Sequence, residues 1–144
     1  MTAELHANVR DRLARTRQRY TRGRLDLVEM LVGIGRPITL SELVEAGAAA
    51  SQSSLYRNLA ILEQCGVVCR VASVDDVARY ELDQELTHHH HHLVCSDCGR
   101  VDDVVLPDIL EASLHAAGDA VGHEHGYTLE SHRLELVGRC GDCA

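Results

Sequence analysis

Two pairs of cysteines in the second half of the sequence have the spacing of metal ligands. Each pair has two residues between its cysteines: Cys95 and Cys98 form one pair, and Cys140 and Cys143 form the other. A tight turn lets both sulfurs of a pair reach one ion, so two pairs supply the four thiolates of a closed tetrahedral zinc site. Two disulfides or unrelated core cysteines are the alternatives, and a reducing cytosol disfavours the disulfides. We therefore predict structural zinc.

Five consecutive histidines, residues 88–92, run into the apolar pair Leu93 and Val94 just before the first cysteine. Their position within the sequence argues against an affinity tag. If the run is a strand, its side chains alternate between two faces. His88, His90 and His92 then point one way, and His89 and His91 point the other. One strand could therefore serve two metal sites, whereas a solvated loop with incidental metal affinity is the alternative.

Size and composition limit the class of protein. A chain of 144 residues, 45% of them hydrophobic, can build one ordinary domain or two small ones. The cores must be aliphatic, because there are four Tyr and no Phe or Trp. Residues 1–24 are polar and arginine-rich, unlike a signal peptide, and no apolar run approaches membrane-spanning length. We expect a cytoplasmic protein that does not associate with membranes.

Charge is divided unevenly along the sequence, although the net charge is −8. Residues 1–72 hold ten Arg against seven Asp and Glu, for +3, and residues 73–144 hold four Arg against fifteen acids, for −11. Seven of the arginines lie within residues 10–24: Arg10, Arg12, Arg15, Arg17, Arg19, Arg22 and Arg24. Such a run can neutralise phosphates, so the first half is suited to nucleic acid and the second to cations.

The first half has the pattern of a winged helix-turn-helix. An amphipathic helix is expected over residues 23–34, because apolar residues recur there at helical spacing. Two more helices, over residues 41–46 and from about residue 51 to Gly66, each follow a capping serine or threonine. The exposed side of the last helix carries Ser54, Tyr56 and Arg57, types that bind bases and phosphates. Residues 67–71 and 78–82 then predict the two strands of a wing.

The second half predicts a small α/β unit. After the histidine strand come a valine-rich strand over residues 100–106 and a helix from Pro107 to about Gly122. Residues 127–139 alternate as a last strand that leads to the second cysteine pair. The helix is expected to turn four side chains inward: Leu110, Leu114, Ala117 and Val121.

Four segments in a fixed order resemble the ferric uptake regulator superfamily. They are residues 54–68 (SLYRNLAILEQCGVV), residues 78–81 (ARYE), the histidine run through Gly99, and the closing cysteine pair. The resemblance covers the sequence from about Arg17 to its end and is strongest to the zinc uptake regulator branch. It implies an α+β fold: an N-terminal winged-helix DNA-binding domain with a basic N-terminal arm (1–82), a hinge (83–87) and a metal-binding dimerisation domain (88–144).

The resemblance also implies roles for individual residues. The four cysteines match the family's structural zinc site. Tyr56 and Arg57 match its DNA-contacting pair, and Arg17 or Arg19 matches a basic contact in the minor groove. His90 and His92 match histidines of the regulatory site between the domains. An additional site is implied by four further matches: His89, His91, Glu111 and His132.

The remaining regulatory ligands depart from the family pattern. Where zinc-sensing relatives have an acid and a cysteine, this sequence has Cys69 and Asp83, with the two types exchanged. Glu81, which is often a ligand in the family, competes with Asp83 for this role. The histidine that iron and manganese sensors take from the helix-turn-helix is missing, since Arg36, Pro37 and Ile38 stand there. A thiolate favours Zn²⁺ at this site, with Fe²⁺, Ni²⁺ and Mn²⁺ as alternatives.

Together these features predict a repressor and not an enzyme. A metal-loaded, zinc-sensing homodimer would bind double-stranded DNA at AT-rich inverted repeats of metal-uptake genes, with no small-molecule substrate. An iron, nickel, manganese or peroxide sensor of the same family is the first alternative. The second is a metalloenzyme built on three histidines and a carboxylate, or a metal-storage protein.

Overall fold

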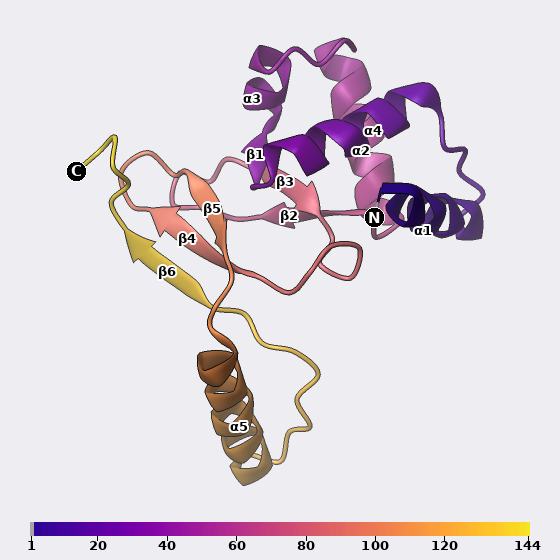
Figure 1. The fold of residues 1–144 in the computed structure, drawn as a ribbon. Coiled ribbons are helices and arrows are strands. Elements are labelled where there is room, and N and C mark those ends of the chain that lie inside the picture. The colour runs from indigo at the N-terminus through magenta and orange to yellow at the C-terminus, as the bar shows by residue number, and fades with distance from the viewer. Residues whose placement is uncertain (1) are drawn as a thin grey trace.

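The computed structural model describes residues 2–144, which form helices α1–α5 and strands β1–β6 (Figure 1). In chain order they are α1 (Thr2–Arg15), α2 (Arg22–Ile34), β1 (Ile38–Thr39), α3 (Leu40–Glu45), α4 (Gln52–Gln64), β2 (Val68–Val71), β3 (Arg79–Leu82), β4 (His91–Cys95), β5 (Val101–Val104), α5 (Asp108–Glu124) and β6 (Glu135–Gly138). None of the helices within residues 2–144 combines the length and the apolar character needed to cross a bilayer.

The arginine-rich start of the sequence is consistent with a basic arm or with a solvated helical face, and the structure forms helix α1 there. Leu5, Val9 and Leu13, spaced four residues apart, are all buried and join the main hydrophobic core. This i, i+4, i+8 stripe was the available signal, and the arginines between its members obscure it. Arg10, Arg12 and Arg15 therefore lie on a packed helix.

Helices α2, α3 and α4 confirm the predicted helix-turn-helix. Gly35, with a φ of 64°, ends α2, and Thr39 and Glu42 form a reciprocal capping box at the start of α3. The Ser51 side chain caps α4 by accepting a hydrogen bond from the N–H of Ser54. Leu55, Leu59 and Leu62 face the core, so the opposite side of α4 is exposed.

The first sheet has the strand order β1-β3-β2, and both pairings are antiparallel. β2 and β3 form the expected wing, with Val68 opposite Leu82 and Val71 opposite Arg79. This pairing is the β-hairpin that completes a winged helix. It also places Glu81 on a strand whose residues are all buried.

The second sheet has the order β5-β4-β6, with β4 antiparallel to β5 and parallel to β6. β6 is much shorter than the predicted strand over residues 127–139, because residues 127–134 form no strand. Part of this segment packs against α5 instead. There Leu129 packs against Gly118 and Gly122 so closely that a side chain on either glycine would press on it. The second sheet is therefore small, with β4 at its centre.

Helix α5 extends away from the two sheets (Figure 1). The prediction that its apolar side chains point inward is wrong for the single chain, since Leu110 is 51% exposed and Val121 is 57% exposed. Of the α5 residues, Gly122 alone is buried. The amphipathic pattern is present, but nothing within residues 2–144 covers most of its apolar side.

The wing also packs against the turn that carries the first cysteine pair. Val71 of β2 shares a small core with Val94 and Val101 of the second sheet. The Ser73 hydroxyl donates to the Gly99 carbonyl at 2.7 Å. Gly99 has a φ of 75°, and a Cβ there would collide with the Asp75 carboxylate. The two sheets are thus in direct contact, independent of any bound ion.

If α1 is part of the core, replacing Leu13 with alanine should lower the free energy of unfolding by about 2–5 kcal/mol, because Leu13 is fully buried. The exposed Asn8 on the same helix supplies the control, and Asn8→Ala should change that free energy by less than about 0.5 kcal/mol. Urea unfolding followed by circular dichroism measures both. Equal, small effects would contradict the assignment of α1 to the core.

Candidate metal centres

Within residues 2–144, three groups of side chains each bring four potential metal-ligand atoms within 4.8 Å of one another. We name them by location. The cysteine group contains Cys95, Cys98, Cys140 and Cys143. The junction group, between the two sheets, contains Glu81, His90, His92 and Asp103. The α5 group contains His89, His91, Glu111 and His132.

Strand β6 creates the cysteine group by running parallel to β4, so that Gly138 pairs with Cys95 and the second cysteine pair follows at once. Both pairs lie in tight turns, closed by hydrogen bonds from Gly99 N to Cys95 O (3.1 Å) and from Cys143 N to Cys140 O (3.0 Å). Arg139 donates to Asp97 at 2.8 Å and ties one turn to the other. All four cysteines are free of disulfides.

Backbone groups make the cysteine group ready for a cation. N–H groups of Cys98 and Cys140 donate to the Cys95 sulfur and lower the pKa of that thiol to about 6. The pKa of Cys143 is instead raised to about 12, because its neighbours Cys140 and Cys98 share hydrogen bonds with it. Four sulfurs in a closed arrangement, one of them already stabilised as thiolate, suit tetrahedral zinc.

The junction group draws its donors from both sheets. Glu81 belongs to β3 of the first sheet, and its two carboxylate oxygens lie 3.0 Å from His90 Nε2 and 2.9 Å from His92 Nε2. Asp103 of β5 lies 3.7 Å from each of the same nitrogens. The His90 side chain is only 3% exposed and that of Glu81 is 7% exposed. The group is therefore a buried contact between the two halves of the fold.

Protons are shared unequally in the junction group. The hydrogen bond to Glu81 raises the pKa of His90 to about 9, although burial opposes this. Burial raises the pKa of Glu81, but hydrogen bonds from His90 and His92 outweigh it and leave that pKa at about 2. Burial, followed by repulsion from Glu81, raises the pKa of Asp103 to about 6. At neutral pH the metal-free group thus holds a proton on His90.

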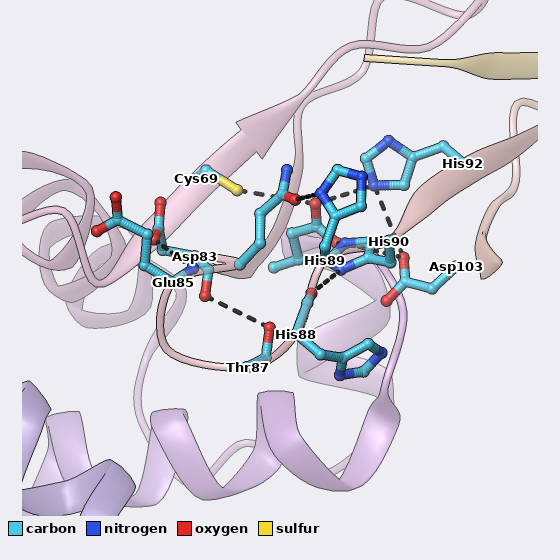
Figure 2. Close-up of polar contacts among 11 residues, drawn as sticks. Cys69, Asp83, Glu85, Thr87, His88, His89, His90, His92 and Asp103 are labelled. Atoms are coloured by element: carbon cyan, nitrogen blue, oxygen red, sulfur yellow. Dashed lines mark hydrogen bonds and ion pairs between the residues drawn. The ribbon is translucent and has the colours of Figure 1, made fainter. Parts of the chain in front are cut away.

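The junction group differs in two members from the ligand set that the sequence predicts. Cys69 lies beside it, with its sulfur 3.7 Å from a Glu81 oxygen (Figure 2). Asp83 accepts hydrogen bonds from Arg12 and from the N–H of Glu85. Glu81, the predicted competitor, takes the place of Asp83. Asp103 was not predicted, because its position opposite His92 depends on the register between β4 and β5.

The α5 group lies on the other side of the histidine strand. Glu111 of α5 is central, with its carboxylate oxygens 3.0 Å from His89, 2.9 Å from His91 and 2.6 Å from His132. The side-chain oxygen of Gln84 accepts a hydrogen bond from His89 Nδ1 (2.9 Å), which leaves Nε2 directed to Glu111. His89 and His91 thus face one group and His90 and His92 the other, as strand alternation requires.

Unpaired buried atoms show that both histidine groups fit a cation. Three atoms of these groups are buried without a well-aligned hydrogen bond: Asp103 Oδ1, Glu111 Oε1 and His132 Nε2. The last two lie 2.6 Å apart. Buried polar atoms are rarely left unpaired in folded proteins. A cavity of about 240 Å³, lined by Cys69 and donors of both groups, gives solvent access. The donor sets and their access suit divalent metal ions.

The predicted DNA-contact residues lie on one side of the N-terminal half. Tyr56 is 60% exposed and Arg57 is exposed on α4, whereas Ser54 is half-buried and bonded to the capping Ser51. Arg17 and Arg19 are exposed in the loop after α1.

Arg24 of α2 connects the loop after α1 to α4, a role that the sequence did not indicate. Its guanidinium donates to Arg19 O at 2.5 Å and to the Asn58 side chain of α4 at 3.3 Å. Arg24 is buried, so it positions the loop against α4 and does not itself face solvent.

Metal binding at the junction group should release protons, because a ligating imidazole must be neutral and the pKa of His90 lies near 9. At pH 7 we expect about one proton per zinc ion from this residue, and an affinity that falls about tenfold per pH unit as pH decreases. Calorimetry in buffers of different ionisation enthalpy measures the count. His90→Ala should release about one proton fewer, and an unchanged count would contradict the assignment.

Comparison with known proteins shows the family of this chain. Residues 15–137 match the Ferric uptake regulator family. Over 101 residues the chain is 36% identical to the ferric uptake regulation protein of Neisseria meningitidis serogroup B, which covers 70% of this chain and 65% of that protein. The match thus spans just under two thirds of that relative. The peroxide-responsive repressor PerR of Staphylococcus saprophyticus is 26% identical over 129 residues, covering 87% of this chain and 82% of PerR.

Solved structures agree in fold. Fur of Helicobacter pylori superposes with a TM-score of 0.74 at 20% identity, covering 99% of this chain and 93% of that one. A zinc-bound manganese uptake regulator gives 0.67 at 28% identity (95% and 98%), and a zinc uptake regulator complexed with zinc and DNA gives 0.56 at 24% identity (99% and 94%). These solved structures are of ferric, manganese and zinc uptake regulators, so they share the fold without singling out a branch. The chain belongs to the ferric uptake regulator family.

Proposed function

We propose that this protein is a metal-dependent transcriptional repressor, which as a metal-loaded homodimer binds AT-rich inverted repeats in front of metal-uptake genes. The observation that supports this most directly is the origin of the junction group. One of its carboxylates lies on the winged-helix sheet, the second carboxylate and His92 lie on the other sheet, and His90 immediately precedes β4 of that sheet. The group is complete only when the two sheets adopt one relative orientation.

That geometry provides the mechanism. A divalent cation, when bound, neutralises the two carboxylates and links donors of both sheets. Glu81 is part of β3, so it moves together with the wing and with α4. His90 and His92 move together with β4. An orientation that brings these donors together binds the ion better than one that separates them, so ion binding shifts the population toward it.

A second copy of the chain supplies the other half of the DNA-binding unit in this proposal. The apolar side chains of α5 and β6 are left exposed, including Ile109, Leu110, Val121, Leu136 and Val137. An uncovered apolar surface of this extent is typical of an interface. The proposed domain boundaries are a DNA-binding domain over residues 1–82, a hinge over 83–87 and a dimerisation domain over 88–144. Two-fold symmetry then calls for an inverted repeat.

On the DNA, α4 is proposed to enter the major groove. Tyr56 and Arg57 are exposed near its N-terminal end, where helices of this motif reach base edges and phosphates. Arg17 and Arg19 extend from the adjacent loop, which Arg24 holds against α4. Ser54 is partly used by the helix cap and is suited to a phosphate contact at most.

Zinc is the proposed ion at the cysteine group and at the junction group. The cysteine group supplies four thiolates, which is a ligand set typical of structural zinc. Cys69 is not a member of the junction group but lies beside it, with its sulfur 3.7 Å from a Glu81 oxygen, and it is the soft donor nearest to that group. Burial and the charges of Glu81 and Asp83 raise the pKa of its thiol to about 12. Iron or manganese sensing is the second candidate, favoured by the two carboxylates of this group.

The function is tested by DNA binding at controlled free-metal concentrations. Duplexes selected from a random pool by the metal-loaded protein serve as the probe, and Zn²⁺, Fe²⁺, Mn²⁺ and Ni²⁺ are titrated separately. We expect zinc to raise the affinity by about 5- to 150-fold. His90→Ala should abolish this response, whereas His123→Ala, which changes an exposed histidine on α5, should retain it. A wild-type affinity that ignores all four ions would refute the proposal, and a response to iron or manganese alone would favour the second candidate.

The cysteine group should be needed for folding and not for sensing. Within residues 2–144, the buried core that includes β4 and β5 consists of Val71, Val94 and Val101. The second sheet therefore has little apolar burial of its own and is expected to depend on the ion bound by the cysteine group. Cys95→Ala should abolish tight zinc retention and the protection of β4–β6 amides against hydrogen exchange. Cys65→Ala, outside the three groups, is the control and should preserve both. Protected β4–β6 amides in metal-free Cys95→Ala would show that the site is dispensable.

A further inference from the structure

Arg12 of α1 reaches the hinge between the two proposed domains. Its guanidinium lies 3.4 Å from the Asp83 carboxylate and 2.8 Å from that of Glu85, and it also donates to the carbonyl of Gly66 at the end of α4. The Arg12 side chain is only 20% exposed. This is a contact over more than seventy residues of sequence, and it joins α1 and α4 to the segment that leads to the histidine strand.

The hinge is an ordered turn and not a flexible linker. The N–H of Glu85 donates to the Asp83 side chain (3.0 Å), and the N–H of Leu86 donates to Asp83 O (2.9 Å). The N–H of Asp83 itself donates to Val67 O (3.0 Å), and Leu86 packs against the main core. Asp83 therefore stabilises the turn through hydrogen bonds within it. Arg12, from helix α1, binds the carboxylates of Asp83 and Glu85.

Both ends of this turn lead to metal donors. Glu81 lies two residues before Asp83, and His90 lies five residues after Glu85. Figure 2 shows Asp83 and Glu85 on one side of the turn, with His92 and Asp103 on the far side, so the two acids of the hinge do not enter the junction group. Their charge is directed to Arg12 instead.

We propose that Arg12 is a positioning residue, which holds the hinge in the conformation that assembles the junction group before an ion binds. This inference rests on the proposed metal-dependent function, since it deepens the account of how the junction group is regulated. Arg12 belongs to the arginine run that suggests DNA contact, but its guanidinium is occupied by two carboxylates and a carbonyl. It therefore acts on metal affinity, and on DNA through that affinity.

The direction of the effect follows from population arithmetic. Apparent affinity equals the intrinsic affinity multiplied by the fraction of molecules in the competent conformation. Loss of the Arg12 contacts lowers that fraction, so zinc affinity at the junction group and DNA affinity of the metal-free protein both fall. At saturating zinc, the bound ion itself holds the donors together, and DNA affinity is nearly restored. A residue that contacts phosphate has the opposite pattern, because it leaves zinc affinity unchanged.

The test compares Arg12→Gln with Arg15→Gln, an exposed arginine three residues along the same helix. Zinc affinity is measured by competition with a chromophoric chelator, with every variant carrying His132→Ala so that the α5 group is disabled. We expect Arg12→Gln to weaken zinc binding about 2- to 30-fold, and Arg15→Gln to leave it unchanged. Glu85→Gln, which alters the hinge side of the contact at an exposed position, should weaken it in the same direction.

Salt dependence of DNA binding, in the presence of saturating zinc and without His132→Ala, separates the two roles. Removing a phosphate contact lowers the slope of log affinity against log salt by about one, as expected if Arg15 touches DNA, whereas Arg12→Gln should leave the slope unchanged. Wild-type zinc affinity in both Arg12→Gln and Glu85→Gln would overturn the inference, as would a reduced salt slope in Arg12→Gln without a loss of zinc affinity. If zinc affinity falls but wild-type DNA binding ignores zinc, the positioning role stands and the proposed function fails.

Discussion

Two carboxylates and two imidazoles confined to one buried space are the interaction on which the rest of the structure depends. Charges in such a place are stable only when they are balanced, and removal of one partner is costly. In the metal-free protein the proton on His90 balances Glu81, while Asp103 is left without a hydrogen bond on one oxygen. Glu81 lies on the first sheet, whereas His92 and Asp103 lie on the second and His90 immediately precedes β4. Any change in this balance therefore acts on the orientation of the two sheets.

How far the sequence predicts the fold depends on the range of the interaction. Local rules predict the caps of α3 and α4, the wing and the division of the histidines between two faces, because each depends on neighbouring residues. Asp103 could not be predicted, since it joins the junction group through a register between strands. The role of Asp83 depends on Arg12, seventy-one residues away in sequence. The exposure of α5 could not be predicted, because an amphipathic pattern does not show whether its apolar side is covered by the same chain.

Three separate contacts fix the relation between the two sheets. The junction group is one, the wing packed on the Gly99 turn is the second, and the hinge held by Arg12 is the third. The second and third are made by the chain alone. The wing contact and the hinge therefore support the same relative orientation of the two sheets that the junction group requires.

The run of five histidines has a consequence for how the gene can change. Donor positions are counted from Cys95, and residues three to six places before it provide His92, His91, His90 and His89. Loss of one histidine from the run would still leave an imidazole at all four places and would remove only the spare, His88. Both centres are thus buffered against a replication slip that would exchange the two faces of an ordinary strand.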